Sequence, residues 1–433
     1  MEIKKGDKKI INAWAFYDWA NSSYPLVITA AIFPVYYVAL TTNFVKGQIP
    51  EISDRVNLFG HSFKNTELYD YVVALSFVIV SFLAPFLSGI ADYIGNKKRF
   101  MQFFCYLGST SCCSLFFFNP DHLFWGMLSV LLASVGFWGS LVFYNAYLPE
   151  IANPEDHDKV SAKGFSMGYF GSALLLILNL VLMSQFKMPP KFSFLTVGIW
   201  WAGFAQITFS KLPNNLYNHQ PKGNFLFKGF NELALVWKDL QNQPILKRYL
   251  TSFFLYSMGV QTVMLVAVMF AKKEIKGIND ANLIISVLII QFVGIVGSVL
   301  FSRLSSRLGN IKALGISIFI WIGICVGTYL WVYTPLHFYI VAGTVGMVMG
   351  GIQSLSRSTY SKFLPETEDH ASYFSFYDVC EKIGIVIGMF SFGLIEGLTG
   401  GMRNSILALV VFFVAGFLVL LTVPKPAKLP SNV

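Results

Sequence analysis

The most informative stretch of the chain is Gly89-Ile90-Ala91-Asp92-Tyr93-Ile94-Gly95-Asn96-Lys97-Lys98-Arg99, a polar loop between two long apolar runs. Gly89 allows two helices to approach closely, and Gly95 permits a tight turn. Asp92 can meet a helix amino terminus or a cation. An ordinary basic turn would explain the three cations but not the Gly/Asp spacing. We therefore predict a gating latch formed by Gly89, Asp92, Gly95, Lys97, Lys98 and Arg99.

The composition around this loop is that of a membrane protein. Of the 433 residues, 55% are hydrophobic and 13% are charged, whereas soluble domains carry about 25% charged residues. The net charge of +9 is interpreted as cationic loops that orient the chain in a bilayer, not as a nucleic-acid surface. Five cysteines lie in apolar runs without metal spacing, and we expect them to act as small hydrophobic residues: Cys105, Cys112, Cys113, Cys325 and Cys380.

Twelve apolar runs are long enough to cross a bilayer, which takes about 20 residues. They cover 13–40, 69–92, 100–118, 122–148, 161–185, 192–211, 246–271, 280–304, 311–333, 336–363, 371–398 and 404–423. The sequence therefore predicts an all-α membrane protein with twelve transmembrane helices in two six-helix bundles.

The distribution of basic residues predicts the orientation. The first apolar run is too long for a cleavable signal and carries Asp18. With the amino terminus inside, 21 of the 32 Lys and Arg residues fall in cytoplasmic segments and nine on the opposite side. Such a bias is typical of cytoplasmic loops. We expect an integral protein of a bacterial inner (plasma) membrane with both termini in the cytoplasm.

Internal similarity supports two halves. Leu148-Pro149-Glu150 after the fourth run recurs as Leu364-Pro365-Glu366 after the tenth, as expected for a duplicated six-helix unit. A polar stretch lies between the halves. We predict an amino-terminal bundle at 1–211, a cytoplasmic linker at 212–245 and a carboxy-terminal bundle at 246–433. Within the linker, Phe225 to Leu240 is a candidate interfacial helix.

The loop at 89–99 resembles the signature loop of the major facilitator superfamily, G-x-x-x-D-x-x-G-r-k-r. The equivalent loop of the second half, Arg303 to Lys312, keeps Gly309 but has Ser306 in place of the acid, so we expect a degenerate second latch. Three further segments resemble the vacuole-effluxer-like facilitators, known in bacteria as the unidentified major facilitator family 1: Ala15–Ser22 (AFYDWANS), Tyr144–Ala152 (YNAYLPEIA) and Gly350–Ser358 (GGIQSLSRS).

The resemblance implies a solute transporter of the major facilitator fold, and fungal members of the family are linked to amino-acid efflux from the vacuole. Many relatives carry an acid after Tyr in the seventh helix, where this chain has Tyr256-Ser257-Met258-Gly259. Ion coupling in this chain would then rest on another group.

Ionisable residues inside the apolar runs mark candidate functional sites, because such a residue costs about 3 kcal/mol at mid-membrane. Asp18 either carries a proton or a substrate ammonium, or pairs with a cytoplasmic lysine at the helix end. Arg357 either snorkels to the surface or binds an anion among neighbouring polar side chains. The polar residues expected around a central cavity are Asp18, Asn21, Tyr144, Asn145, Tyr256, Gln261, Gln353 and Arg357.

The eleventh run carries three more charges, Asp378, Glu381 and Lys382, which the first half lacks. Asp378 and Lys382 have the i,i+4 spacing that favours a pair on one helix face, which would leave one acid unpaired. That acid either couples ion movement to transport, or the three charges only pack against the latch loop.

Together these features predict a secondary active transporter that moves a small polar solute, such as an amino acid or peptide, by ion-coupled alternating access. The expected partners are the solute, a coupling proton or sodium ion, and the lipid bilayer, with no nucleic acid, cofactor or metal site and with a monomeric state. The alternatives are a transporter of lipids or lipid-linked precursors, and a non-transporting receptor or scaffold. No nucleotide-binding loop or catalytic triad indicates an enzyme.

Overall fold

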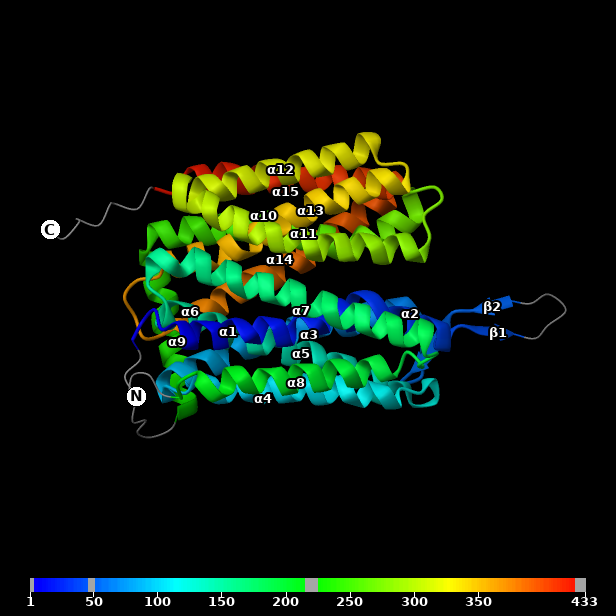
Figure 1. The fold of residues 1–433 in the computed structure, drawn as a ribbon, viewed down its shortest axis with the longest axis horizontal. Helices are drawn as coiled ribbons and strands as arrows, with labels where there is room; N and C mark the ends of the chain where they lie inside the picture. The colour runs from blue at the N-terminus through cyan, green and yellow to red at the C-terminus, as the bar shows by residue number, and fades with distance from the viewer. Residues whose placement is uncertain (1–3, 46–50, 215–224, 425–433) are drawn as a thin grey trace.

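The computed structural model describes residues 4–45, 51–214 and 225–424. Within these residues there are twelve long helical segments. They lie along the long axis of the molecule, and consecutive segments run in opposite directions (Figure 1). The first is a composite of α1 (Lys8–Asn21), a π-helical stretch (Tyr24–Ile32) and α2 (Phe33–Thr41). The others are α3 (Asn65–Ile94), α4 (Lys97–Ser114), α5 (Leu123–Ala146), α7 (His157–Gln185), α8 (Phe192–Lys211), α10 (Pro244–Glu274), α11 (Asp280–Leu308), α12 (Asn310–Trp331), α13 (Pro335–Phe363), α14 (His370–Thr399) and α15 (Met402–Leu421).

Shorter elements occupy the connections. α6 (Leu148–Ile151) follows α5, and the predicted linker helix is present as α9 (Phe225–Asn242), which packs mainly against α3. Linker residues 215–224 lie outside the described residues. Two β-hairpins connect the first span to α3: β1 (Asn43–Val45) with β2 (Glu51–Ser53), and β3 (Arg55–Leu58) with β4 (His61–Lys64).

Figure 1 shows the helices of the first half gathered on one side of the molecule and those of the second half on the other. α1 begins and α15 ends at the same end of the bundle, called here the termini end, and β1 and β2 project from the opposite end. Across the boundary α7 packs against α11 and α13, while α3 and α5 pack against α14. The exact domain boundaries at 211 and 246 stay a prediction.

The outer surface of the bundle is apolar, as a surface facing lipid must be. Phe82 on α3, Phe390 on α14 and Val411 on α15 are 79%, 70% and 67% exposed. Within the described residues, 11 helical segments are long and apolar enough to cross a membrane. The twelfth is α14, whose 30 residues include Asp378, Glu381 and Lys382. The predicted twelve-helix membrane protein is therefore confirmed.

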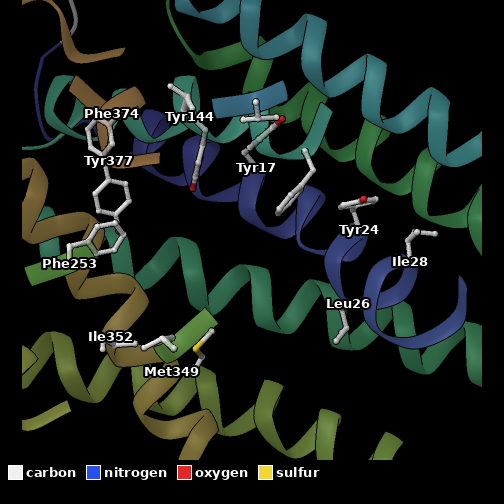
Figure 2. Packing of buried hydrophobic residues seen from close by; sticks show 14 of the residues in the cluster. Tyr17, Tyr24, Leu26, Ile28, Tyr144, Phe253, Met349, Ile352, Phe374 and Tyr377 are labelled. Carbon is white, nitrogen blue, oxygen red and sulfur yellow. The ribbon is translucent and has the colours of Figure 1, made fainter. Parts of the chain in front are cut away.

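Aromatic side chains fill the interior of both halves (Figure 2). Tyr17 on α1 lies against Tyr144 on α5, with ring centroids 5.2 Å apart. In the second half, Phe253 on α10 stacks on Tyr377 on α14 at 4.0 Å. Large rings bury much apolar area while keeping specific mutual geometry, so they fix the positions of α1, α5, α10 and α14, which carry Asp18, Tyr144, Tyr256 and Asp378.

Glycines set the closest helix contact, between α11 and α13. A Cβ atom on Gly350 would lie 2.1 Å from the carbonyl oxygen of Gly294, and one on Gly297 would lie 2.0 Å from that of Met347. Both distances are far below van der Waals contact with rigid backbone, so only glycine permits this approach. Small residues at helix crossings are a general device of membrane bundles.

We expect Gly350→Ala to lower the free energy of unfolding by about 1–3 kcal/mol, the usual cost of overpacking a tight contact. Gly343→Ala on the same helix is the matched control, because its Cβ would meet nothing closer than 3.8 Å. Thermal unfolding of the purified protein in detergent compares the two. Equal stability of both variants would show that this close approach is not needed.

Candidate functional site

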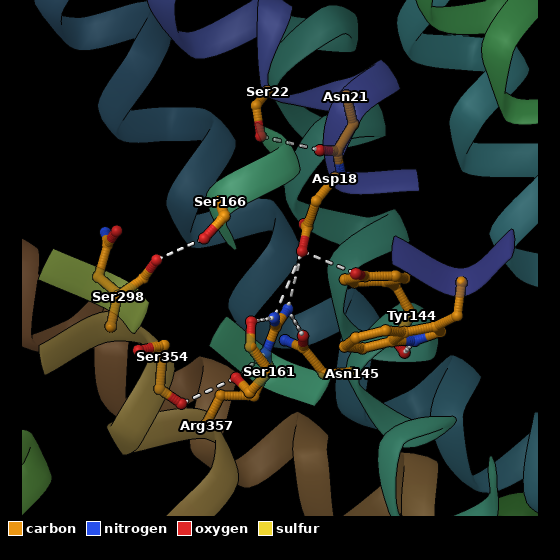
Figure 3. A network of polar contacts seen from close by, with 12 residues as sticks. Asp18, Asn21, Ser22, Tyr144, Asn145, Ser161, Ser166, Ser298, Ser354 and Arg357 are labelled. Carbon is orange, nitrogen blue, oxygen red and sulfur yellow. Dashed lines mark hydrogen bonds and ion pairs between the residues drawn. The ribbon is translucent and has the colours of Figure 1, made fainter. Parts of the chain in front are cut away.

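The centre of the candidate site is an ion pair between the two halves. Asp18 lies on α1 and Arg357 on α13, and both are almost completely buried, with 5% and 3% of their surface exposed. Two guanidinium nitrogens of Arg357 each lie 3.3 Å from Oδ2 of Asp18. Figure 3 shows the arginine reaching from α13 toward α1. Two alternatives from the sequence are wrong: Arg357 does not snorkel to the surface, and Asp18 does not pair with a lysine.

Polar groups of the first half complete the coordination of this pair (Figure 3). The Tyr144 hydroxyl donates to Oδ2 of Asp18 over 2.7 Å. Arg357 donates to the Asn145 side-chain oxygen at 3.2 Å, and to the hydroxyl and carbonyl oxygens of Ser161 at 2.9 and 3.0 Å. Because a buried charge is tolerated only when paired and hydrogen-bonded, these contacts explain how an arginine remains inside a membrane bundle.

Aromatic rings surround the guanidinium of Arg357. Its central carbon lies 4.8 Å from the ring centre of Trp14, 5.4 Å from that of Tyr144 and 4.2 Å from that of Phe165. Cation–π contacts of this kind stabilise a desolvated cation. A Cβ on Gly164 would lie 2.4 Å from Oδ2 of Asp18, so this glycine lets α7 approach the pair.

Trp14, Ser161 and Phe165 were not predicted as site residues. Trp14 and Phe165 are aromatic residues of the kind that ordinarily fills the core of a membrane protein. Only their proximity to Arg357 in the folded structure gives them a role. The one usable signal was Gly164, a small residue near the start of a long helix, where a close approach could be expected.

The remaining predicted cavity residues do not join this network directly. Gln353 accepts a hydrogen bond from Tyr169 at 2.7 Å, and the Tyr256 hydroxyl lies 2.7 Å from the hydroxyl of Ser356. Asn21 accepts a weak bond from Ser22 at 3.4 Å. Gln261 instead belongs to the charge cluster of α14.

That second cluster contains the expected i,i+4 pair, with the Lys382 nitrogen 2.6 Å from Oδ1 of Asp378. Glu381 is not left alone, because its Oε2 lies 3.0 Å from the same nitrogen and its Oε1 accepts a 2.7 Å hydrogen bond from Gln261. One lysine thus serves two carboxylates. The Lys382 nitrogen also lies 3.7 Å from the ring centre of Trp138 on α5, so the cluster contacts the first half.

The predicted latch loop binds the start of α14. Oδ1 and Oδ2 of Asp92 accept hydrogen bonds from the backbone N–H groups of Ala371 and Ser372, at 3.2 and 2.7 Å. A carboxylate at a helix amino terminus is favourable because unpaired N–H groups and the helix dipole point toward it. Gly95 has φ of 72°, the left-handed conformation that its turn requires, and Gly89 is buried within α3.

The three cations of the latch do not all sit at the surface. Lys97 is buried, forms an ion pair with Asp92 at 3.3 Å and also binds Glu150. Lys98 donates to the carbonyl oxygen of Leu212 at 3.0 Å, and Arg99 is exposed. Lys97 also donates to the carbonyl oxygen of Glu368 at 3.3 Å, so it is part of the contact between the halves.

The second latch is completed by an acid from the other half. Ser306 indeed supplies no carboxylate, but Asp158 at the start of α7 does. Its two oxygens accept hydrogen bonds from Ser305, Asn310 and Ser358 and form an ion pair with Lys362, each at 2.7 Å. The second loop thus lacks an acid of its own, as expected, and Asp158 of the first half supplies one. Sequence reasoning missed Asp158 because it lies in a polar segment where an acid normally faces water.

All these contacts lie between the termini end and the middle of the helices. In the part of the chain that the structure describes, hydrogen bonds between the halves reach as far as Ser172 of α7 and Gln291 of α11, which lie 3.4 Å apart. Both residues are near the midpoints of their helices. The structure is thus one in which the halves are held together at the termini end.

Asp369 lies beside the latch, outside the spanning helices, and this environment shifts the pKa of its carboxyl. Burial raises the pKa of its carboxyl from the ordinary 3.8 to about 7, and the nearby carboxylates of Asp92 and Glu232 act in the same direction. Lys97 and a hydrogen bond from Thr367 oppose this shift in pKa. Near neutral pH this residue gains a negative charge beside the latch acid.

We expect Asp158→Asn to lower the free energy of unfolding by about 2–3 kcal/mol, because the amide leaves Lys362 without its counter-ion and cannot accept from all three hydrogen-bond donors. Thermal unfolding in detergent measures the loss. Asp156→Asn, an exposed acid two residues away, is the control and should unfold like the wild type. If the two variants have equal stability, Asp158 does not complete a latch.

We expect the free energy of unfolding to fall as the pH rises from about 4 to about 7. The folded state keeps a proton on Asp369 that the unfolded chain releases near its ordinary pKa of 3.8. Asp369→Asn should remove this part of the pH dependence and be more stable than the wild type above pH 7. Unfolding temperatures across this range test the effect, with the exposed Glu366→Gln as control. An unchanged pH profile in Asp369→Asn would contradict it.

Comparisons with known proteins identify the family of the chain. The family model described as "Vacuole effluxer Atg22 like" matches residues 6–429. An uncharacterized MFS-type transporter, YxiO of Bacillus subtilis, is 30% identical over 425 residues, which cover 96% of this chain and 94% of that protein. Autophagy-related protein 22 of Kluyveromyces lactis is 25% identical and covers 94% of this chain and 92% of its own length.

Solved structures show the same fold at low sequence identity. The human organic anion transporter MFSD10 (TETRAN) superposes with a TM-score of 0.73 at 10% identity, covering 96% of this chain and 100% of its own. The E. coli fucose:proton symporter FucP gives a TM-score of 0.66 at 14% identity, covering 96% and 98%. The family model and the 30% identical relative both match nearly the whole chain, which shows that the chain belongs to the Atg22-like vacuole effluxer family of major facilitator transporters.

Proposed function

We propose that this membrane transporter moves a small polar solute, with an amino acid or short peptide as the preferred class, by ion-coupled alternating access. The observation that carries the proposal is the buried pair of Asp18 and Arg357, with one charge on each half. When the halves of a transporter move apart, Asp18 and Arg357 separate, and each charge then needs another partner.

The chemistry of the pair favours a zwitterion. A carboxylate such as Asp18 binds an ammonium group, and the planar guanidinium of Arg357 binds a carboxylate through two parallel hydrogen bonds. If the halves separated with nothing between them, each charge would be left uncompensated, which costs several kcal/mol in a buried site. A solute with both charges would compensate Asp18 and Arg357 at once.

Alternating access accounts for the uneven distribution of contacts between the halves. The latch acids Asp92 and Asp158 and the pair of Asp18 and Arg357 all lie toward the termini end. We infer that this end is cytoplasmic, so the structure corresponds to a state closed to the cytoplasm. The opposite state would require these contacts to open while the far end closes.

The relatives support the transporter class more than the cargo. The matching family is described as vacuole effluxers, FucP as a fucose:proton symporter and MFSD10 as an organic anion transporter. None of these descriptions identifies the solute of this chain, so the amino-acid class rests on Asp18 and Arg357. We further propose that the chain acts as a monomer in a bacterial plasma membrane, with a rigid bundle on each side of the 212–245 linker.

Uptake into liposomes tests the proposal. The purified protein is reconstituted and offered a panel of radiolabelled amino acids and dipeptides under imposed pH or sodium gradients. We expect uptake of at least one zwitterion, and a decrease of about tenfold or more in Asp18→Asn and Arg357→Lys, since losing a charge-assisted hydrogen bond costs about 1.5–3 kcal/mol. Arg357→Lys keeps the positive charge but loses the planar guanidinium that donates two parallel hydrogen bonds.

Arg248→Lys, at an exposed arginine, is the matched control and should transport like the wild type. Uptake that survives both site substitutions and ignores every gradient would overturn the proposal. Failure of all zwitterions, combined with thermal stabilisation by phospholipid alone, would also overturn it and would favour a lipid cargo.

A further inference from the structure

The charge cluster of α14 lies apart from the Asp18–Arg357 pair and has an uneven charge. Asp378 and Glu381 are two carboxylates, and Lys382 is the cation that both contact, at 2.6 and 3.0 Å. With all three ionised the cluster has one negative charge in excess. An uncompensated charge inside a membrane bundle is expensive and marks an ion or proton pathway by default.

The two carboxylates differ in their hydrogen bonds. Both oxygens of Glu381 have partners, since Oε1 accepts from Gln261 and Oε2 from Lys382. Asp378 is 4% exposed, and while its Oδ1 binds Lys382, its buried Oδ2 has no hydrogen-bond partner among the residues that the structure describes. A buried carboxylate oxygen without a partner is strongly disfavoured, and a proton on that oxygen removes most of the cost.

A proton suits this site better than a metal cation. Lys382 already occupies the position between the two carboxylates that a sodium ion would need, and its ammonium would repel a second cation there. Sodium would also have to find several further oxygen ligands in place of these contacts. A proton requires only one free lone pair, and adding it brings the net charge of the cluster to zero.

Other ionisable groups near the cluster do not supply the missing positive charge. Within α14, Cys380 and Tyr377 carry no positive charge in either protonation state, and neither does Tyr256 on α10. α5 contributes the neutral Trp138, and Arg357 on α13 is engaged by Asp18. α3 brings Asp92 only to the first turn of α14, and Arg403 of α15 pairs with Glu274 near the opposite end.

We propose that Asp378 takes up the coupling proton of the transport cycle, with Glu381 and Lys382 as the positioning residues that create the need for it. This inference rests on the proposed function and identifies its coupling ion. In the step, hydronium gives its proton to Oδ2 of Asp378, an O–H bond forms, water is released and the cluster becomes neutral. Glu381, whose side chain is 18% exposed, is the less buried of the two carboxylates.

The cluster is placed to pass this change on to the other half. Lys382 contacts both Asp378 and the ring of Trp138, at 3.7 Å from the ring centre. When Asp378 is neutral, the ammonium is held by one carboxylate in place of two. The attraction of the Lys382 ammonium to the carboxylates of α14 then weakens relative to its attraction to the ring of Trp138 on α5. Protonation thus alters a contact between the halves.

Infrared spectroscopy detects the proton without any transported solute. Difference spectra of the full-length protein in lipid, recorded while the pH is changed across the neutral range, report the carbonyl stretch of protonated carboxylic acids. All samples carry Asp369→Asn, because the carboxyl of Asp369 would itself titrate near pH 7. In this background we expect a band that disappears when Asp378→Asn is added. It should also be absent in Glu381→Gln, because that change removes the excess charge that makes proton uptake favourable.

Glu396→Gln is the matched control on the same helix, where Glu396 binds the exposed Lys273 at 2.6 Å, and it should keep the band. Asp18→Asn should keep it too. A band that persists in Asp378→Asn, or one that sodium but not potassium abolishes in the Asp369→Asn background, would overturn the proposal. The spectra need no cargo, so they remain decisive even if the solute panel for the proposed function fails.

The transport assay adds a second readout. Asp378→Asn should still exchange a transported solute across the membrane at equal concentrations, but it should lose accumulation driven by a pH gradient. A purely structural role of Asp378 would lower exchange and accumulation together. Accumulation that survives in Asp378→Asn would contradict the assignment.

Discussion

The cost of placing a charge in a membrane interior is the constraint on which this structure depends. Few of the described ionisable groups lie within the bundle, and three of the acids are paired through contacts that bring different helices together. Asp18 of α1 meets Arg357 of α13, Asp158 of α7 meets Lys362 of α13, and Asp92 of α3 meets the first turn of α14. Because each partner stands on a different half, satisfying these charges also holds the halves together at the termini end.

Much of the fold could be predicted from the sequence because it follows from local patterns. Apolar runs of bilayer length locate the helices, and the i,i+4 spacing of Asp378 and Lys382 locates their pair. The sequence contains the glycines that allow α11 and α13 to touch, but it does not indicate which helix each glycine contacts. The predicted linker helix likewise required only an amphipathic run.

The partners of the charges could not be predicted, since they come from distant parts of the chain. For Arg357 the sequence left two interpretations open, snorkelling and anion binding, because its partner Asp18 lies 339 positions away. Asp158 looked like a solvated loop acid, although it fills the place of the acid missing at Ser306. Lys97 resembled its surface neighbours Lys98 and Arg99, yet it is buried between carboxylates. In each case tertiary structure outweighs local sequence.

A double-mutant cycle on Asp18 and Arg357 tests most directly whether this pair couples the two halves. The free energy of unfolding is measured for Asp18→Asn, Arg357→Gln and the double variant. Because either single change leaves a buried charge uncompensated, the account predicts that the double variant is more stable than the sum of the single losses implies, with a coupling energy of about 2 kcal/mol or more. Additive losses would show that the two charges do not depend on each other and would contradict the account.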